Sequence, residues 1–280
     1  MNYQQILNKG SKILKVNNIK SFNLDSEILL SSAVGLERAC LLLNLEKEID
    51  DKRKKIFFNL IERRKKSEPV AYILGHKEFW KQKFKVNSNV LIPRPDTETL
   101  VESVLKELDY NSKKKILDIG TGSGCIILSI LKERKKCLGV GVDISKNAIK
   151  LAKYNAKIQH IENRIKFFNS DIDNFYLDKY DLIISNPPYI KLHKINSLEN
   201  DIKHHEPKEA LDGGIDGYSK IKLVVYKSSF LIKKKGKLFL EVGSNQIMRT
   251  LEILKKNGFY KKDIIKDLSN KCRCIIAIKI

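Results

Sequence analysis

The chain has 280 residues, of which 42% are hydrophobic, so we expect a folded protein with one large or two smaller domains rather than a disordered chain. Its formal net charge of +21 admits a nucleic-acid or other acidic partner, but the Lys residues occur in every region, as a chain-wide compositional bias would produce. No run approaches the roughly 18 apolar residues of a membrane helix, and the N-terminus lacks the apolar segment of a signal peptide. We therefore expect a cytoplasmic protein without a membrane partner.

Residues 1–75 are predicted to form a small helical domain. The stretch DSEILLSSAVGL carries apolar residues at helical spacing, with Asp25 or Ser26 as the capping residue. The stretch DKRKKIFFNLIERRKKSEPVAYILG does the same, with Pro69 beginning a new turn and Gly75 ending it.

Residues 76–95 are predicted to form a hairpin between this domain and a second one, residues 96–280. In KEFWKQKFKVNSNVLIPRP, aromatic and β-branched residues flank the turn-forming NSN.

From about residue 96, helices alternate with strands. Strands are expected at 114–120, 137–144, 165–171, 180–186, 237–243 and 272–280. Helices are expected at 96–108, 125–134, 145–158, 219–232 and 245–258. This alternation predicts an α/β fold with a parallel sheet covered on both faces.

A glycine-rich turn follows the first of these strands, in LDIGTGSGCI. Its residues are Gly120, Thr121, Gly122, Ser123 and Gly124. Glycines let a ligand lie against bare backbone, although the spacing is neither that of a P-loop nor G-x-G-x-x-G. Asp143 ends the next strand, 19 residues after Gly124, where an acidic side chain accepts hydrogen bonds from ribose hydroxyls. The alternative for Asp143 is a helix N-cap shared with Ser145, but both features together predict a nucleoside cofactor.

Two further aspartates lie near this predicted site. Asp118 precedes the glycine turn and either faces a cationic or amino group or caps the backbone that follows. Asp171 ends the third strand, where it either approaches an adenine amino group or simply begins a loop.

The stretch NPPY ends the fourth strand, at the sheet edge where open α/β folds bind ligands. Pro187 and Pro188 hold the backbone rigid. The Asn186 carbonyl and the Pro187 backbone carbonyl can then accept both N–H groups of a planar amino group, and Tyr189 offers an aromatic face for stacking. A strand ended by prolines explains the stiffness but not the Asn and Tyr together. The motif therefore predicts a site that orients an amino nitrogen toward a methyl donor.

No metal site is expected. Cys272 and Cys274 would share one face of a strand, but no second Cys or His pair lies at zinc spacing. The five His residues show neither metal nor triad spacing.

Together, these features resemble the Rossmann-like S-adenosylmethionine-dependent methyltransferases that act on planar amino nitrogens of DNA adenine, ribosomal RNA guanine or protein glutamine. Further stretches narrow the resemblance: EPVAYILG, LIPRPDTE, HEPKEALDGGIDG and LEVGSNQ. In this order they resemble the release factor glutamine methyltransferases, the PrmC/HemK family, from about residue 25 to the C-terminus.

The resemblance implies a class I methyltransferase domain that binds S-adenosylmethionine through Gly120–Gly124 and Asp143, with Asp171 or Ile172 near the adenine. Asn186–Tyr189 would hold the substrate, the glutamine of the Gly-Gly-Gln motif of class 1 peptide chain release factors. Asn186 would also lie close to the donated methyl group. The helical domain would help dock the release factor, and we expect a monomer. Arg94 would anchor the segment that closes over the cofactor; the alternative for this segment is a hairpin exit held by Pro93 and Pro95.

Three residues depart from the family pattern. Asp96 stands where Glu is usual, His205 where Tyr is usual, and Ile172 where an aromatic often stacks on adenine.

Two other functions remain open. The charge and NPPY also fit a methyltransferase acting on a nucleic-acid base, although no insertion resembles a base-recognition domain. A non-catalytic RNA-associated protein with the same fold is the other.

Overall fold

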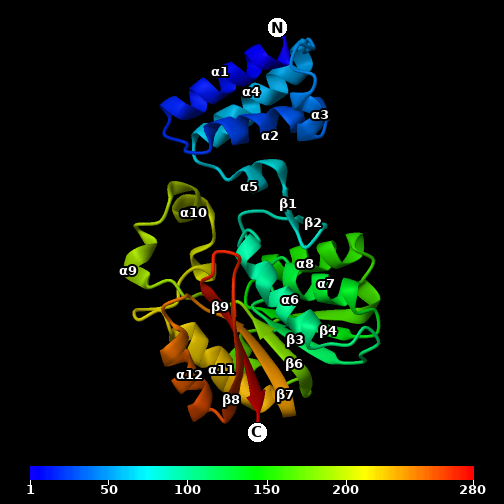
Figure 1. The fold of residues 1–280 in the computed structure, drawn as a ribbon, viewed down its shortest axis with the longest axis vertical. Helices are drawn as coiled ribbons and strands as arrows, with labels where there is room; N and C mark the ends of the chain where they lie inside the picture. The colour runs from blue at the N-terminus through cyan, green and yellow to red at the C-terminus, as the bar shows by residue number, and fades with distance from the viewer. The chain divides into compact units, whose positions relative to one another are not determined.

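A computed structural model describes all residues from 1 to 280, and the chain divides into two compact units (Figure 1). One consists of Met1–His76 and Glu199–His205, and the other of Lys77–Leu198 and Glu206–Ile280. The short segment Glu199–His205 thus packs with the helical unit, although it lies far along the sequence. No helix is both long and apolar enough to cross a membrane.

The helical unit packs its helices around one apolar core. Its helices are α1 (Tyr3–Val16), α2 (Phe22–Val34), α3 (Arg38–Leu42), α4 (Asp51–Lys65), α5 (Val70–Leu74) and α10 (Asn200–His205). The fully buried side chains include Ile6, Leu29 and Phe57. Helix α5 is preceded by Pro69 and followed by Gly75 with φ of 76°, which confirms the expected turn and end.

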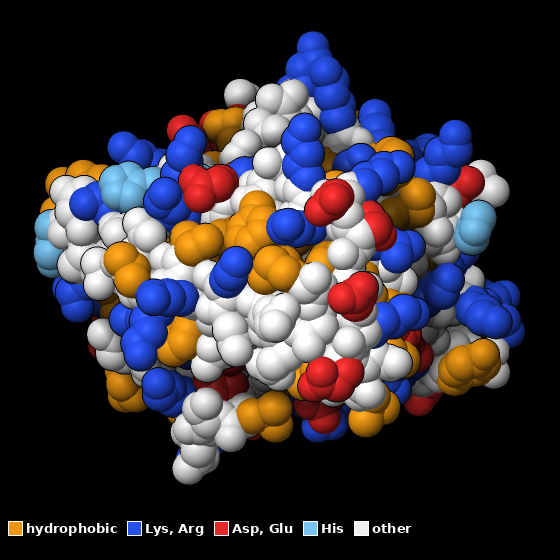
Figure 2. Space-filling view, turned by 90° about the horizontal axis from the view of Figure 1, so that it is seen from above, with side chains coloured by type: hydrophobic (Ala, Val, Ile, Leu, Met, Phe, Trp, Pro, Cys, Tyr) orange, Lys and Arg blue, Asp and Glu red, His pale blue; other side chains and the backbone are white.

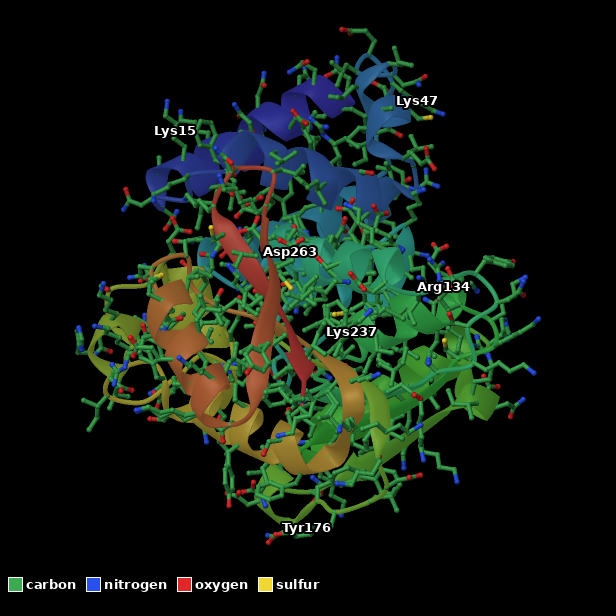
Figure 3. The ribbon with its side chains drawn as sticks, turned by 60° about the horizontal axis from the view of Figure 1, so that its bottom comes forward. Lys15, Lys47, Arg134, Tyr176, Lys237 and Asp263 are labelled. Carbon is green, nitrogen blue, oxygen red and sulfur yellow. The ribbon has the colours of Figure 1, made fainter.

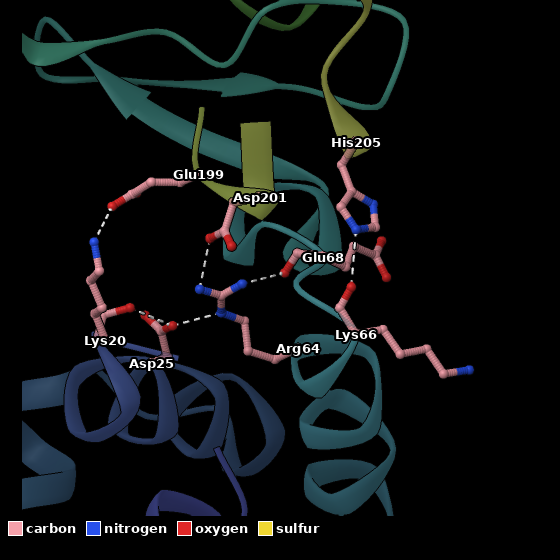
Figure 4. A network of polar contacts seen from close by, with 9 residues as sticks. Lys20, Asp25, Arg64, Lys66, Glu68, Glu199, Asp201 and His205 are labelled. Carbon is pink, nitrogen blue, oxygen red and sulfur yellow. Dashed lines mark hydrogen bonds and ion pairs between the residues drawn. The ribbon is translucent and has the colours of Figure 1, made fainter. Parts of the chain in front are cut away.

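The predicted cap of α2 is wrong. The helix begins at Phe22, so Asp25 and Ser26 lie inside it and are buried. The buried Asp25 carboxylate pairs with Arg64 of α4: Arg64 Nε lies 2.6 Å from Asp25 Oδ2. The same guanidinium lies 2.7 Å from Asp201 Oδ2 of α10 through Nη2 (Figure 4). This buried network holds the segment Glu199–His205 within the helical unit.

The hairpin is shorter than expected. Strands β1 (His76–Phe79) and β2 (Gln82–Lys85) are joined by Trp80 and Lys81, whose φ angles are 48° and 59°. The turn therefore lies at Trp80–Lys81 and not at the NSN stretch, where Val90 N donates to Asn87 O in a separate turn. Two non-glycine residues at positive φ give no ordinary turn signal in the sequence.

The second unit is built on a seven-stranded sheet with the order β5-β4-β3-β6-β7-β9-β8. The strands are β3 (Lys115–Ile119), β4 (Leu138–Asp143), β5 (Ile165–Asn169), β6 (Tyr180–Ser185), β7 (Ile232–Glu241), β8 (Phe259–Lys266) and β9 (Cys272–Lys279). β3 to β7 pair in parallel, as predicted, whereas β9 runs antiparallel between β7 and β8. Strand β8 was not predicted from the sequence.

Helices cover both faces of this sheet. The α-helices of the unit are α6 (Glu98–Lys106), α7 (Cys125–Glu133), α8 (Lys146–Ile158), α9 (Leu192–Ile195), α11 (Ser219–Leu231) and α12 (Ile247–Lys256). One apolar cluster contains buried residues of α6, α7 and α8, and the other contains those of α11 and α12. Figure 3 draws the side chains of the whole chain, with Lys237 of β7 and Asp263 of β8 labelled.

Cys272 and Cys274 do not share a face of β9 as expected. Cys274 is buried in the cluster under α6, whereas Cys272 packs against the cluster under α12. The cause is a shift in pairing with β8, because Ile265 pairs with Cys274 and Lys266 with Cys272. Arg273 is the extra residue, and such a bulge redirects side chains.

Candidate functional site

Four residues lie in a row at the carboxyl edge of the parallel strands. The register aligns the strand-end residues Val142, Ile119, Ser185 and Leu240 on β4, β3, β6 and β7. The next residue on each strand is Asp143, Gly120, Asn186 and Glu241, respectively. Neighbouring strands lie about 4.8 Å apart, so the sheet itself brings these residues together.

The row also lies at the point where the strand order reverses. From β3, the chain continues outward through β4 and β5 on one side, and through β6 and β7 on the other. Open α/β sheets bind ligands at this kind of crevice. Glu241 also belongs to the row, but it was not predicted as a site residue. It is the last residue of β7, and Asn186 is the residue directly after β6.

The glycine turn presents open backbone. Gly120 and Gly122 have φ of +74° and +54°, and a Cβ built on either residue meets no heavy atom within 4 Å. Gly124 differs, because its built Cβ would lie 3.0 Å from Leu128 Cδ1 and its φ is +81°. The first two glycines thus leave room for a ligand, whereas Gly124 also serves packing at the start of α7.

Thr121 and Ser123 hold the turn from within. Thr121 Oγ1 donates to Asp118 Oδ2 at 2.7 Å, and the Ser123 carbonyl accepts from Asn155 Nδ2 at 2.8 Å. Asn155 of α8 also bonds the backbone N–H and C=O of Lys85, at 2.8 and 3.0 Å. A single buried amide therefore links the turn to strand β2, and this link was not predicted.

Asp143 supports the same turn and keeps acceptor capacity. Its Oδ2 accepts from Gly122 N at 2.8 Å and its Oδ1 from Ser145 N at 2.9 Å. The cap of α8 is Ser145 itself, which accepts from Ala148 N. Burial raises the pKa of Asp143. Each carboxylate oxygen has a second lone pair, so both can also accept from hydroxyl groups.

Asp118 is fully buried beside the turn. Burial raises its pKa to about 7, and Asp143 adds to the rise. Its Oδ2 accepts from Thr121, whereas its Oδ1 has no hydrogen-bond partner. An unpartnered buried carboxyl oxygen is costly, and such atoms concentrate at functional sites.

Asp171 and Ile172 occupy different environments. Asp171 is exposed and accepts from Asp173 N at 3.1 Å, capping a short 3-10 turn, Ile172–Asn174. Ile172 is 8% exposed and belongs to the apolar cluster that contains Val142 and Phe175. Both therefore follow β5 near the row, but only Asp171 presents a polar group outward.

The NPPY segment keeps two acceptors unused. Asn186 Nδ2 donates to Thr97 Oγ1 at 3.2 Å, and Glu241 lies beside Asn186 on the neighbouring strand. No hydrogen bond within the chain engages Asn186 Oδ1 or the Pro187 carbonyl. Pro188 and Tyr189 are partly buried, and burial, together with the Glu241 charge, raises the pKa of Tyr189 to about 12.

A glycine loop supports the backbone of this segment. A Cβ on Gly213 would lie 2.8 Å from the Tyr189 Cα and carbonyl carbon, and one on Gly217 would lie 2.8 Å from the Tyr189 carbonyl oxygen. Gly213 N donates to Ile190 O at 2.8 Å. The stretch ALDGGIDG therefore contains glycine where the NPPY backbone passes too closely for a side chain.

Two ion pairs hold the segment that precedes α6. Arg94 pairs with Glu206, whose side chain is 1% exposed and also accepts from Ile92 N at 3.4 Å. Asp96 Oδ2 lies 2.9 Å from Nη2 of Arg273, the bulged residue of β9. The sequence indicated Arg94 and Asp96, but not their partners Glu206 and Arg273, because those contacts join distant segments.

The positive charge is dispersed over the visible surface. Figure 2 shows Lys and Arg side chains around much of one face, with Asp and Glu side chains among them. The view contains no single stripe of basic residues of the kind that tracks a nucleic-acid backbone.

Two protein families match the chain: residues 5–75 match the PrmC N-terminal domain, and residues 95–211 match the methyltransferase small domain. A release factor glutamine methyltransferase of Clostridium acetobutylicum is 37% identical over 100% of this chain and 99% of its own length. One from Buchnera aphidicola is also 37% identical, over 100% of both chains.

Solved structures agree on the fold of the second unit. A methyltransferase from Pyrococcus furiosus has a TM-score of 0.52 at 16% identity, over 70% of this chain and 88% of its own. A ribosomal protein L11 methylase from Lactobacillus delbrueckii has a TM-score of 0.51 at 15% identity, over 67% of this chain and 81% of its own. These likenesses show a class I methyltransferase fold. The chain belongs to the PrmC family of release factor glutamine methyltransferases, which makes it an S-adenosylmethionine-dependent methyltransferase.

Proposed function

We propose that this enzyme methylates the side-chain amide nitrogen of the glutamine in the Gly-Gly-Gln motif of class 1 peptide chain release factors. The observation that carries the proposal is the pair of unused acceptors, Asn186 Oδ1 and the Pro187 carbonyl, on a backbone held by two prolines. A glutamine carboxamide offers two N–H donors in one plane, and two fixed acceptors fit that group.

The acceptors also suit the chemistry. An amide nitrogen is a weak nucleophile. Positive charge develops on it as it takes a methyl group, and it becomes neutral again by losing one of its two N–H protons. Fixed acceptors at Asn186 and Pro187 stabilise this charge more in the transition state than in the ground state. Tyr189 would pack against the planar amide and keep its nitrogen in line.

The residues around the glycine turn fit S-adenosylmethionine, which supplies an activated methyl group on a sulfonium. Gly120 and Gly122 would let it lie against open backbone. Asp143 would accept from its ribose hydroxyls, and the unpartnered Asp118 Oδ1 would face a positive or N–H group. Asp171, exposed after β5, is placed to accept from the adenine amino group, with Ile172 as apolar packing beneath.

The helical unit is the proposed docking element for the release factor. It matches the PrmC N-terminal domain over nearly its whole length. We further propose that the protein acts as a monomer in the cytoplasm, where translation takes place.

A second candidate substrate is a nucleic-acid base with an exocyclic amino group, because its N–H donors would fit the same acceptors. The net charge of +21 favours it, while the dispersed arrangement of the basic residues on the face that Figure 2 shows does not. Nucleic-acid binding would weaken steeply with salt.

The test uses purified enzyme with methyl-labelled S-adenosylmethionine and separate substrates. These are a class 1 release factor, its Gln→Ala variant in the Gly-Gly-Gln motif, and total nucleic acid. We expect label only in the release factor with the intact glutamine. Label in nucleic acid, or equal label in the Gln→Ala variant, would contradict the proposal.

A further inference from the structure

The Thr97 hydroxyl contacts the site. Thr97 is the last residue of the 3-10 turn Pro95–Thr97, which leads into α6, and its side chain makes no cap hydrogen bond. It is 3% exposed, and its hydroxyl accepts from Asn186 Nδ2 at 3.2 Å. The hydroxyl is thus directed toward the site.

Glu241 faces the same amide. It ends β7 beside Asn186 in the sheet register, and it is 3% exposed. Its Oε2 has no hydrogen-bond partner, and hydrogen bonding from Thr97 and Asn186 acts to lower its pKa. A buried carboxylate with an unsatisfied oxygen costs stability, which favours a functional reason for its presence.

These contacts determine how the Asn186 carboxamide is oriented. Its nitrogen donates to Thr97 Oγ1 at 3.2 Å, and the Glu241 carboxylate lies on the neighbouring strand beside it, so the N–H groups have acceptors on this side and Oδ1 is left over. Rotating the amide by half a turn would place Oδ1 against the Glu241 carboxylate, and two acceptors would then repel each other. Without these neighbours, the Asn186 carboxamide could adopt either of its two orientations.

We propose that Glu241, together with Thr97, is a positioning residue that fixes the Asn186 carboxamide with Oδ1 toward the substrate nitrogen. This inference rests on the proposed function and adds two residues to it. An ionised Glu241 beside the amide would also polarise it and make Oδ1 a stronger acceptor. That polarisation matters most when charge develops on the substrate nitrogen.

The surroundings of Glu241 allow it to titrate near neutrality. Burial raises its pKa to about 7, the hydrogen bonds from Thr97 and Asn186 oppose the rise, and Arg273 opposes it as well. The charged and titratable groups that face it from the packed elements are Asp96, Tyr189, Arg273, Cys125 and Cys274. Protonation of Glu241 would replace an acceptor by a donor and release the orientation of Asn186.

The first test is kinetic. Glu241→Gln should lower kcat on the release factor by about tenfold or more, with the S-adenosylmethionine Kd and the thermal midpoint close to the wild type. Thr97→Val should lower kcat, and Thr97→Ser, which keeps the hydroxyl, should restore most of it. Glu252→Gln on the exposed face of α12 is the matched control and should be neutral. The wild-type kcat should fall below about pH 7 and that of Glu241→Gln should not.

The second test does not need a substrate. In protein labelled with ¹⁵N at asparagine side chains, the Asn186 amide resonances are assigned by their loss in Asn186→Ala. In the wild type they should shift with a midpoint near pH 7, and in Glu241→Gln the shift should vanish. Asn186 resonances that do not shift with pH in the wild type, or a wild-type kcat in Glu241→Gln, would overturn the inference. Coupled resonances in an enzyme that does not methylate release factors would instead reject the proposed substrate and keep the positioning role.

Discussion

Gly213→Ala is expected to impair methyl transfer by moving the backbone that carries the two acceptors. The added Cβ would lie 2.8 Å from Tyr189 Cα and from its carbonyl carbon, and 3.0 Å from the Gly217 carbonyl oxygen. Backbone atoms cannot turn aside as a side chain can. Reaching ordinary contact requires the two segments to separate by about 0.6 Å or more.

The size of the effect follows from this displacement. Overpacking of this kind costs about 1–3 kcal/mol, which corresponds to roughly 3–9 °C in the thermal midpoint of a domain of this size. Misplacing a reacting group by about 1 Å can lower the rate by roughly 100-fold, so we expect a loss in kcat of about tenfold or more. The Kd for S-adenosylmethionine should change little, because the glycine turn is a separate segment.

The assay compares kcat on a release factor with the thermal midpoint followed by the fluorescence of Trp80, the single tryptophan. Gly258→Ala is the matched control. Gly258 has φ of +73°, its built Cβ meets only the flexible end of Lys279, and it precedes β8 at the opposite edge of the sheet. This control should lose stability and keep kcat. A wild-type kcat in Gly213→Ala, or equal losses in both variants, would refute the reasoning.

Two further predictions concern stability. Arg64→Met should lower the free energy of unfolding by about 3–5 kcal/mol in urea titrations followed by circular dichroism, because it leaves Asp25 buried without its partner. The control is Arg53→Met, at an exposed ion pair, which should lower it by less than about 1 kcal/mol. Equal losses in the two variants would contradict this prediction. Burial raises the pKa of Asp118 to about 7, so its contribution to stability is present at low pH and is lost as pH rises from about 4 to about 7. Asp118→Asn cannot ionise, so its stability relative to the wild type should increase over this range by roughly 4 kcal/mol, and a difference independent of pH would contradict the assignment.

The local pattern of the sequence predicted most of the second unit. Helical and strand periodicity located α6, α7, α8, α11, α12 and the five parallel strands but not the short helix α9, and strand ends indicated Gly120, Asp143 and Asn186 as site residues. The hairpin turn was misplaced because Trp80 and Lys81 adopt positive φ without glycine. Strand β8 was missed because seven of its eight residues are exposed or partly exposed in a run, which hides the alternation.

The residues that the sequence did not reveal act through contacts between distant segments. Glu241 and Thr97 lie 144 positions apart, and they meet only because β7 pairs with β6 and the start of α6 lies over the same edge. Arg64 similarly meets Asp201 across the sequence. One signal was available for Glu241: it is a charged residue at the end of a buried strand, in the position that matches Asn186 on its own strand.

The most direct test of the central claim is site mapping by mass spectrometry of a release factor incubated with S-adenosylmethionine and either the wild-type enzyme or Asn186→Ala. With the wild type, one added methyl group is expected on the glutamine of the Gly-Gly-Gln motif. With Asn186→Ala, which should still fold and bind S-adenosylmethionine, the rate should fall by about 100-fold or more. Methylation at another residue, or wild-type turnover by Asn186→Ala, would contradict it.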